Sequence, residues 1–172
     1  MTRDDAAALA QRLLEAWNAR DLDAFMALLA DDVEWYDPAM HAPPARGRAA
    51  VRAFADAVIE AFPDFTYEIQ PPICTAPDGS RCAIMWRITA THRHPLRPLS
   101  FAPTGRRASF TGVDVIDVRG GRVTRILTAF DLVAPAEQLL GTSLRPAPGT
   151  WQARVLVTLQ RLAARWARRR HR

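Results

Sequence analysis

The fold is decided by residues 108–131, which read ASFTGVDVIDVRGGRVTRILTAFD. Polar and apolar residues alternate on both sides of Gly120-Gly121, and such a period of two is typical of β-strands. A pair of glycines between two strands favours a tight hairpin turn. The pattern therefore predicts strands over 108–119 and 123–132 that pair as an antiparallel hairpin.

The residues before this hairpin predict further elements: helices in the N-terminal part, then more strands. Alternation predicts strands over 33–37, 65–70 and 81–94. Apolar residues at helical spacing predict helices over 4–18, 22–29 and 49–61, and Asp21 can cap the second of these. Helices followed by a run of antiparallel strands predict an α+β domain in which the helices cover one face of the sheet.

Charge divides the chain into a body and a basic tail. The body, residues 1–143, has 15 arginines and 18 acidic residues, a net charge of −3. The tail has eight arginines over 144–172 and no Asp or Glu. We therefore expect a domain over 1–143, a Pro- and Gly-containing linker over 144–149 and a helix over 150–172.

The expected C-terminal helix is amphipathic and basic. At 100° per residue its arginines gather opposite an apolar face that holds Trp151, Val155, Leu159, Leu162 and Trp166. Such a helix can lie on an anionic membrane or dock on a partner protein. It can also pack on its own domain or on a second copy. Nucleic acid is the weakest option, because the acidic body offers no wider basic surface.

The rest of the composition points to a cytoplasmic protein. No apolar run reaches the roughly 18–20 residues that a membrane span needs, and the polar N-terminus does not resemble a secretory signal. The two cysteines, Cys74 and Cys82, flank a turn, and in a reducing compartment we expect two free thiols.

The order of short motifs along the chain resembles the SnoaL-like proteins of the NTF2-like superfamily, including the polyketide and ester cyclases. The matching positions span about residues 8–141: Trp17-Asn18, Asp21, 28–33, Gly47-Arg48, Thr91-His92, 103–106, 110–114, 120–123, Asp131 and 137–141. The resemblance implies a cone-shaped domain whose curved sheet wraps around a pocket closed by the N-terminal helices. It also implies a homodimer through the outer face of the sheet. The wider fold includes ketosteroid isomerases and limonene-epoxide hydrolases.

Three residues are the candidates for acid/base catalysis: Asp131, Asp114 and His92. Asp131 ends an apolar strand and matches the late aspartate of the family, which resembles the acid/base residue of the cyclases. A carboxylate in an apolar cavity loses hydration, so its pKa rises, and it can take a proton next to a carbonyl group and later return it. Asp114 stands where many members have histidine.

Each candidate also has a purely structural interpretation. Asp131 could cap a helix over 134–140, and Asp114 could lie at a rim or a dimer surface. His92 could bond a loop carbonyl at the end of its strand. Asp37, directly before Pro38, is expected to form a turn.

The aromatic residues are usually core, but several of them would line the cavity of a cone-shaped domain. They favour a flat, apolar and small ligand. The expected substrate contacts are Trp17, Trp35, Phe54, Phe62, Trp86, Phe110 and Phe130, with His41 in a loop at the pocket mouth.

No motif for a phosphate, zinc, redox or nucleophile site occurs in the sequence. We therefore expect neither cofactor nor metal. The sequence favours an acid/base enzyme that cyclises or isomerises a small apolar carbonyl or polyketide-like substrate in an enclosed pocket. The alternatives are a non-catalytic ligand-binding or dimerisation module and an epoxide hydrolase of the limonene-epoxide-hydrolase type.

Overall fold

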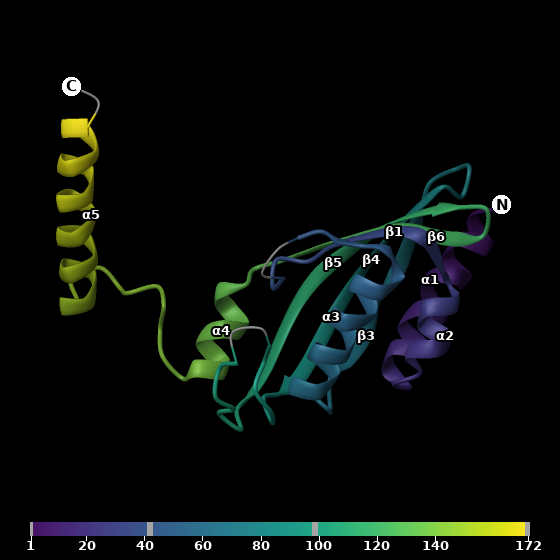
Figure 1. Cartoon of the computed structure of the whole chain (residues 1–172), viewed down its shortest axis with the longest axis horizontal. Coiled ribbons are helices and arrows are strands. Elements are labelled where there is room, and N and C mark those ends of the chain that lie inside the picture. The colour runs from purple at the N-terminus through teal and green to yellow at the C-terminus, as the bar shows by residue number, and fades with distance from the viewer. Residues whose placement is uncertain (1, 41–42, 98–99, 171–172) are drawn as a thin grey trace. The chain divides into compact units, whose positions relative to one another are not determined.

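The larger part of the protein is built around one curved, six-stranded sheet (Figure 1). The structure is a computed structural model that describes residues 2–40, 43–97 and 100–170. It divides into two units, Met1–Gly141 and Thr142–Arg172. The first unit contains the sheet, with strands β1 Leu29–Tyr36, β2 Ala45–Arg46, β3 Thr66–Thr75, β4 Arg81–Thr91, β5 Arg107–Arg119 and β6 Arg122–Phe130.

The strands lie in the order β2-β1-β6-β5-β4-β3. All neighbours are antiparallel except β1 and β6, which are parallel, so the sheet is mixed. Gly120 and Gly121 turn β5 into β6 with φ of 58° and 73°, a conformation that glycine adopts without steric cost. The α+β prediction and the hairpin over residues 108–131 are confirmed.

Helices cover the buried face of the sheet, which we call the inner face (Figure 1). They are α1 Arg3–Asn18, α2 Leu22–Ala27, α3 Gly47–Ala61 and α4 Val133–Leu140. Thr2 and Asp5 form a capping box at the start of α1, and the Asp21 carboxylate accepts a hydrogen bond from the N–H of Ala24 at the start of α2. The buried side of α1 ends in Trp17, which packs into the core.

Two element boundaries differ from the sequence expectation. The helix expected to reach Leu29 ends at Ala27, and Leu29 begins β1. Strand β3 does not stop at Pro71 but runs on to Thr75, with a register shift between Gln70 and Cys74. Because β3 is an edge strand, prolines without an N–H group leave no ladder bond unmade on its outer side.

Both cysteines are free thiols, as expected. The register pairs Cys74 with Ala83, and Cys82 with Thr75, so the two side chains belong to opposite faces of the sheet. Cys82 is buried in the core, whereas Cys74 is exposed. The homodimer through the outer face stays a prediction.

The second unit consists of a connecting segment and helix α5, Trp151–Arg170. Its apolar side chains are exposed, including both tryptophans. Over the residues that the structure describes, no helix combines the length and the apolar character that crossing a bilayer requires.

Trp86 is the largest side chain in the middle of the inner face, and it depends on a glycine. It is fully buried on β4 opposite Gly112 of β5, and its ring lies across that glycine. A Cβ on Gly112 would come within 2.7 Å of the backbone oxygen of Ala129 and still closer to the Trp86 ring. Gly112 therefore makes room for the indole.

The Gly112→Ala variant should destabilise the first unit by about 3 kcal/mol, because the new methyl group overpacks a ring and a backbone oxygen that cannot both move. Urea unfolding followed by circular dichroism measures this. As a control, Gly120→Ala meets no atom within 4 Å and pays only for its left-handed backbone, about 1 kcal/mol. Equal losses in the two variants would contradict the close approach of Trp86.

Candidate functional site

Asp114 is a buried acidic residue in the middle of the inner face. It lies on β5, the residue is 4% exposed, and its cross-strand neighbours are Ile84 on β4 and Thr128 on β6. Ile116 follows it on the same face and is fully buried. Of the two interpretations of this residue, the structure therefore supports the interior position over the rim.

Burial raises the pKa of Asp114 to about 7, and repulsion from Asp37 adds to the rise. The Thr128 hydroxyl and the Trp86 indole N–H lie close enough to oppose it by favouring the charged form. Thr128 accepts a hydrogen bond of 3.0 Å from Trp35 Nε1, which leaves its own proton to be directed elsewhere. Asp114 is therefore poised to exchange a proton near neutral pH.

A second buried carboxyl, Asp37, follows the end of β1. Its Oδ1 accepts a 2.7 Å hydrogen bond from the N–H of Ala39, so it forms the expected turn. It is also buried, and burial raises its pKa to about 6. The sequence analysis missed this burial, although Asp37 continues the inward-facing alternation of Val33 and Trp35.

Tyr67 on β3 lies close enough to both carboxyls for their charges to change the pKa of its phenol. Burial raises the pKa of its phenol well above the usual value, and the charges of Asp114 and Asp37 raise it further. Its backbone is held by Asn18, whose side chain donates to the carbonyl and accepts from the N–H of Tyr67, both at 2.8 Å. Sequence reasoning did not select Tyr67, which its alternation with Phe65 and Ile69 placed on the inner face.

A cavity of about 10 Å³ lies at this cluster, room for about one water molecule. It is lined by Leu13, Leu14, Trp17, Phe25, Trp35, Tyr67, Asp114 and Ile126. Two buried polar atoms of the lining residues have no hydrogen-bond partner among the described residues: Oδ1 of Asp114 and Nε1 of Trp17. The interior thus offers one acceptor and one donor within an aromatic lining.

Six of the aromatic residues expected at the substrate site form one continuous wall together with Tyr67. Trp17 contacts Trp35 and Tyr67 edge-on at 5.7 and 5.9 Å between ring centroids, and Tyr67 contacts Trp86 at 5.6 Å. The wall extends from there to the three rings that are partly exposed: Phe54, Phe110 and Phe130. The expected Phe62 lies apart from it, stacked on His92 at 5.3 Å.

Asp131 does not lie in the apolar interior. It is exposed, and its Oδ1 accepts a 2.9 Å hydrogen bond from the N–H of Val133 at the start of α4. The expectation of a buried Asp131 is wrong, because the strand ends at Phe130 and the next residue already belongs to the turn into the helix.

His92 is buried but distant from Asp114. It lies eight positions beyond Ile84, the cross-strand neighbour of Asp114, and at about 3.3 Å per residue that is roughly 26 Å along the strand. Burial lowers the pKa of His92, which favours the neutral imidazole. The structure therefore does not join His92 and Asp114 in one site, and His41 lies outside the described residues.

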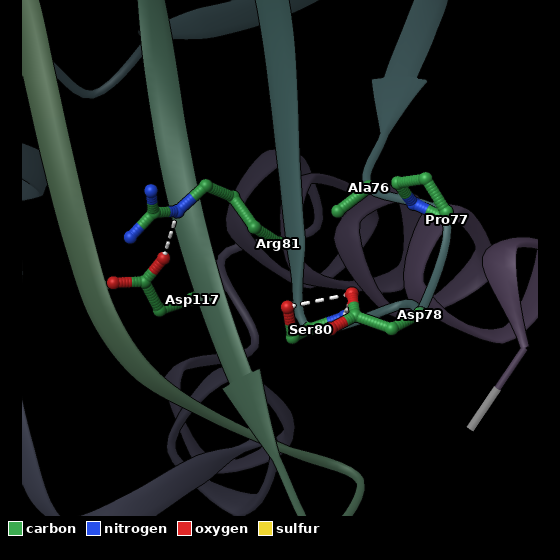
Figure 2. Close-up of a pocket in the computed structure, with 6 residues that line it drawn as sticks. All are labelled: Ala76, Pro77, Asp78, Ser80, Arg81 and Asp117. Atoms are coloured by element: carbon green, nitrogen blue, oxygen red, sulfur yellow. Dashed lines mark hydrogen bonds and ion pairs between the residues drawn. The ribbon is translucent and has the colours of Figure 1, made fainter.

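A larger hollow, of about 630 Å³, lies on the surface at the turn between β3 and β4 (Figure 2). Its charged groups are paired with each other: Arg81 with Asp117, and Asp78 with Ser80. It contains none of the candidate residues. In the described part of the chain, no group of three or more His, Cys, Asp or Glu side chains could hold a metal ion.

Comparisons with known proteins agree with the fold. Among solved structures, a proposed polyketide cyclase from Xanthomonas campestris pv. campestris has a TM-score of 0.69 and 25% identity, over 80% of this chain and 98% of its own. IdmH, a proposed polyketide cyclase from Streptomyces antibioticus, has a TM-score of 0.64 and 28% identity, over 80% and 99%. A Mycobacterium tuberculosis protein in complex with estradiol-17β-hemisuccinate has a TM-score of 0.63 and 21% identity, over 76% and 96%.

No curated protein sequence matches the chain. The family model of the SnoaL-like domain matches residues 10–126, which is more than half of the chain and includes α2, α3 and strands β1 to β5. The protein therefore belongs to the SnoaL-like domain family.

Proposed function

We propose that the protein is a cofactor-independent acid/base enzyme that cyclises or isomerises a small, apolar carbonyl compound of the polyketide type. The observation that carries this proposal is the buried Asp114 carboxyl, whose pKa lies near 7. Its Oδ1 has no hydrogen-bond partner among the described residues and lies in an aromatic interior. The similarity to IdmH and to the Xanthomonas protein supports the same substrate class.

The proposed step begins with a substrate whose carbonyl oxygen accepts from the indole N–H group of Trp17. This group is a buried donor without a partner among the described residues, and it lines the cavity beside Asp114. The ionised Asp114 removes a proton from the carbon next to the carbonyl, and the electron pair moves onto the oxygen as an enolate. To close a ring, the enolate carbon bonds to the carbon of a second carbonyl group, whose π electron pair moves onto its own oxygen and takes up the proton. To isomerise a β,γ-unsaturated ketone, the dienolate is protonated at its γ carbon by the same carboxyl. The proton returns from Asp114 in either case.

For a substrate to reach Asp114, the aromatic side chains around the cavity must move apart. A cavity of about 10 Å³ holds no organic ligand, so the rings have to open a larger space. Phe110 and Phe130 are partly exposed and contact Trp86, which makes their end of the wall the proposed entrance. A mycobacterial protein of this fold is in complex with estradiol-17β-hemisuccinate, a ligand much larger than this cavity.

A second candidate function is a non-catalytic module of this fold, and the filled interior favours it. Trp17, Trp35 and Trp86 are buried and occupy the space that a ligand would need. Such a module would keep Asp114 protonated and would not exchange protons with any ketone. The activity experiment below distinguishes the two functions.

The Asp114→Asn variant should lower turnover by about 10²–10⁴-fold, because an amide cannot take up the proton. A direct measurement is the exchange of hydrogen for deuterium next to the carbonyl in a panel of aromatic bicyclic and tricyclic ketones, followed by NMR. Asp117→Asn is the matched control on the same strand, since Asp117 pairs with Arg81 outside the interior. Loss of exchange in Asp131→Asn instead would return the role to Asp131, and no exchange by the unmodified protein would favour the non-catalytic module.

The rate of exchange should rise with pH through about 7 and level off above it, because only the ionised form of Asp114 is a base. Initial rates between about pH 5 and 9 give this profile. A rate that stays constant across this range would contradict Asp114 as the base.

Stability should change in the opposite direction. The folded state raises the Asp114 pKa from 3.8 to about 7, so between these values it binds a proton that the unfolded chain has released. The contribution of Asp114 to the free energy of unfolding should therefore fall by up to about 4 kcal/mol as the pH rises from about 4 to 7, and the raised pKa of Asp37 adds a fall between about pH 4 and 6. Urea titrations at several pH values test this, and Asp114→Asn should flatten the dependence. An identical slope in that variant would contradict the raised pKa.

A further inference from the structure

Helix α5 carries an exposed apolar face, and it is the only helix or strand among the described residues of the second unit. Its members are Trp151, Val155, Leu156, Leu159, Leu162 and Trp166, each at least half exposed. At 100° per residue they span about 140° of the helix surface. Contiguous exposed apolar surface of this kind marks a site of association with a protein or a membrane.

The opposite side of α5 carries a cluster of arginines. Arg154, Arg161, Arg165 and Arg168 are exposed and lie within about 60° of one another around the helix. Residues 144–172 contain no acidic side chain, so nothing in this segment neutralises them. The positive charge is thus concentrated on the unit that also exposes the apolar face.

We propose that α5 binds in the plane of an anionic lipid bilayer, with its apolar face in the headgroup region and its arginines above the surface. A bilayer of anionic lipid accommodates both faces at once, because it presents an apolar phase beneath a layer of negative charge. Nucleic acid would neutralise the arginines and leave six large apolar side chains in water. The 20 residues of α5 give a contact about 30 Å long.

The two tryptophans support this orientation. They lie on the apolar face 15 residues apart, at about 22 Å along the axis, near the two ends of the helix. Tryptophan favours the boundary between lipid headgroups and hydrocarbon, so one anchor stands at each end of the contact.

The same tryptophans provide a specific signal for the full-length protein. Trp17, Trp35 and Trp86 are buried in the first unit, whereas Trp151 is 70% and Trp166 59% exposed. A blue shift of tryptophan emission on adding vesicles would therefore report on α5. We expect the shift, together with co-sedimentation, for vesicles of about three parts phosphatidylcholine to one part phosphatidylglycerol, and much less for phosphatidylcholine alone.

Matched variants separate the two faces. Val155→Ser should weaken binding about tenfold, whereas Val157→Ser, the same change on the arginine side of the same helix, should have little effect. Replacing Arg154, Arg161 and Arg165 by Gln should weaken binding on the order of a hundredfold. Replacing the exposed Arg3, Arg12 and Arg107 by Gln removes equal charge from the first unit and should leave binding nearly unchanged.

Three outcomes would overturn the proposal. The first is no blue shift and no co-sedimentation with anionic vesicles, and the second is equal loss in each variant and its control. The third is tight binding of a labelled DNA duplex without binding of the vesicles, which would assign the helix to nucleic acid.

Discussion

The packing of Trp86 against Gly112 is the constraint on which the inner face depends. Every second residue of a strand normally points its Cβ to the same face of the sheet, and the Trp86 indole needs one of these positions to lack a Cβ. With Trp86 in place, Tyr67, Phe110 and Phe130 contact its edges and faces, and the aromatic wall becomes continuous. Asp114 follows Gly112 by one inward-facing position, so the same packing sets the surroundings of the carboxyl.

Those surroundings make ionisation of the two buried acids unfavourable, and both acids avoid that cost by staying protonated. A charged carboxylate in an apolar interior loses far more hydration energy than a neutral carboxyl does, so both Asp37 and Asp114 hold their protons to unusually high pH. A group that is neutral when alone, yet can ionise at moderate pH, suits reversible proton transfer better than a permanently charged one. Stability and chemistry would then be in competition at a single residue.

The sequence predicted the fold far better than it predicted the site. Turn and cap residues act locally, so Gly120-Gly121 and Asp21 could be recognised from their neighbours alone. Alternation along β5 suggested that Asp114 faces inward, but only the assembled sheet decides between an interior and a rim. Asp131 was placed wrongly because a strand and the following turn differ by one residue, and Asp37 was missed because a turn former can also be buried. Tyr67 has no distinguishing motif, and its role depends on helix α1 closing over β3.

The parallel pairing of β1 with β6 joins segments that are far apart in the sequence, such as Trp35 and Ile126. A growing chain on the ribosome makes β1 early, but its permanent neighbour emerges only after about 90 further residues. Until then the strand has β2 alone on one side, and its other edge is open to any strand it meets. The exposed Asp31 and Asp32 within β1 place negative charge on that edge during the wait and disfavour pairing with a second nascent chain. The topology thus makes the last strand of the sheet the step that commits the domain to its native pairing.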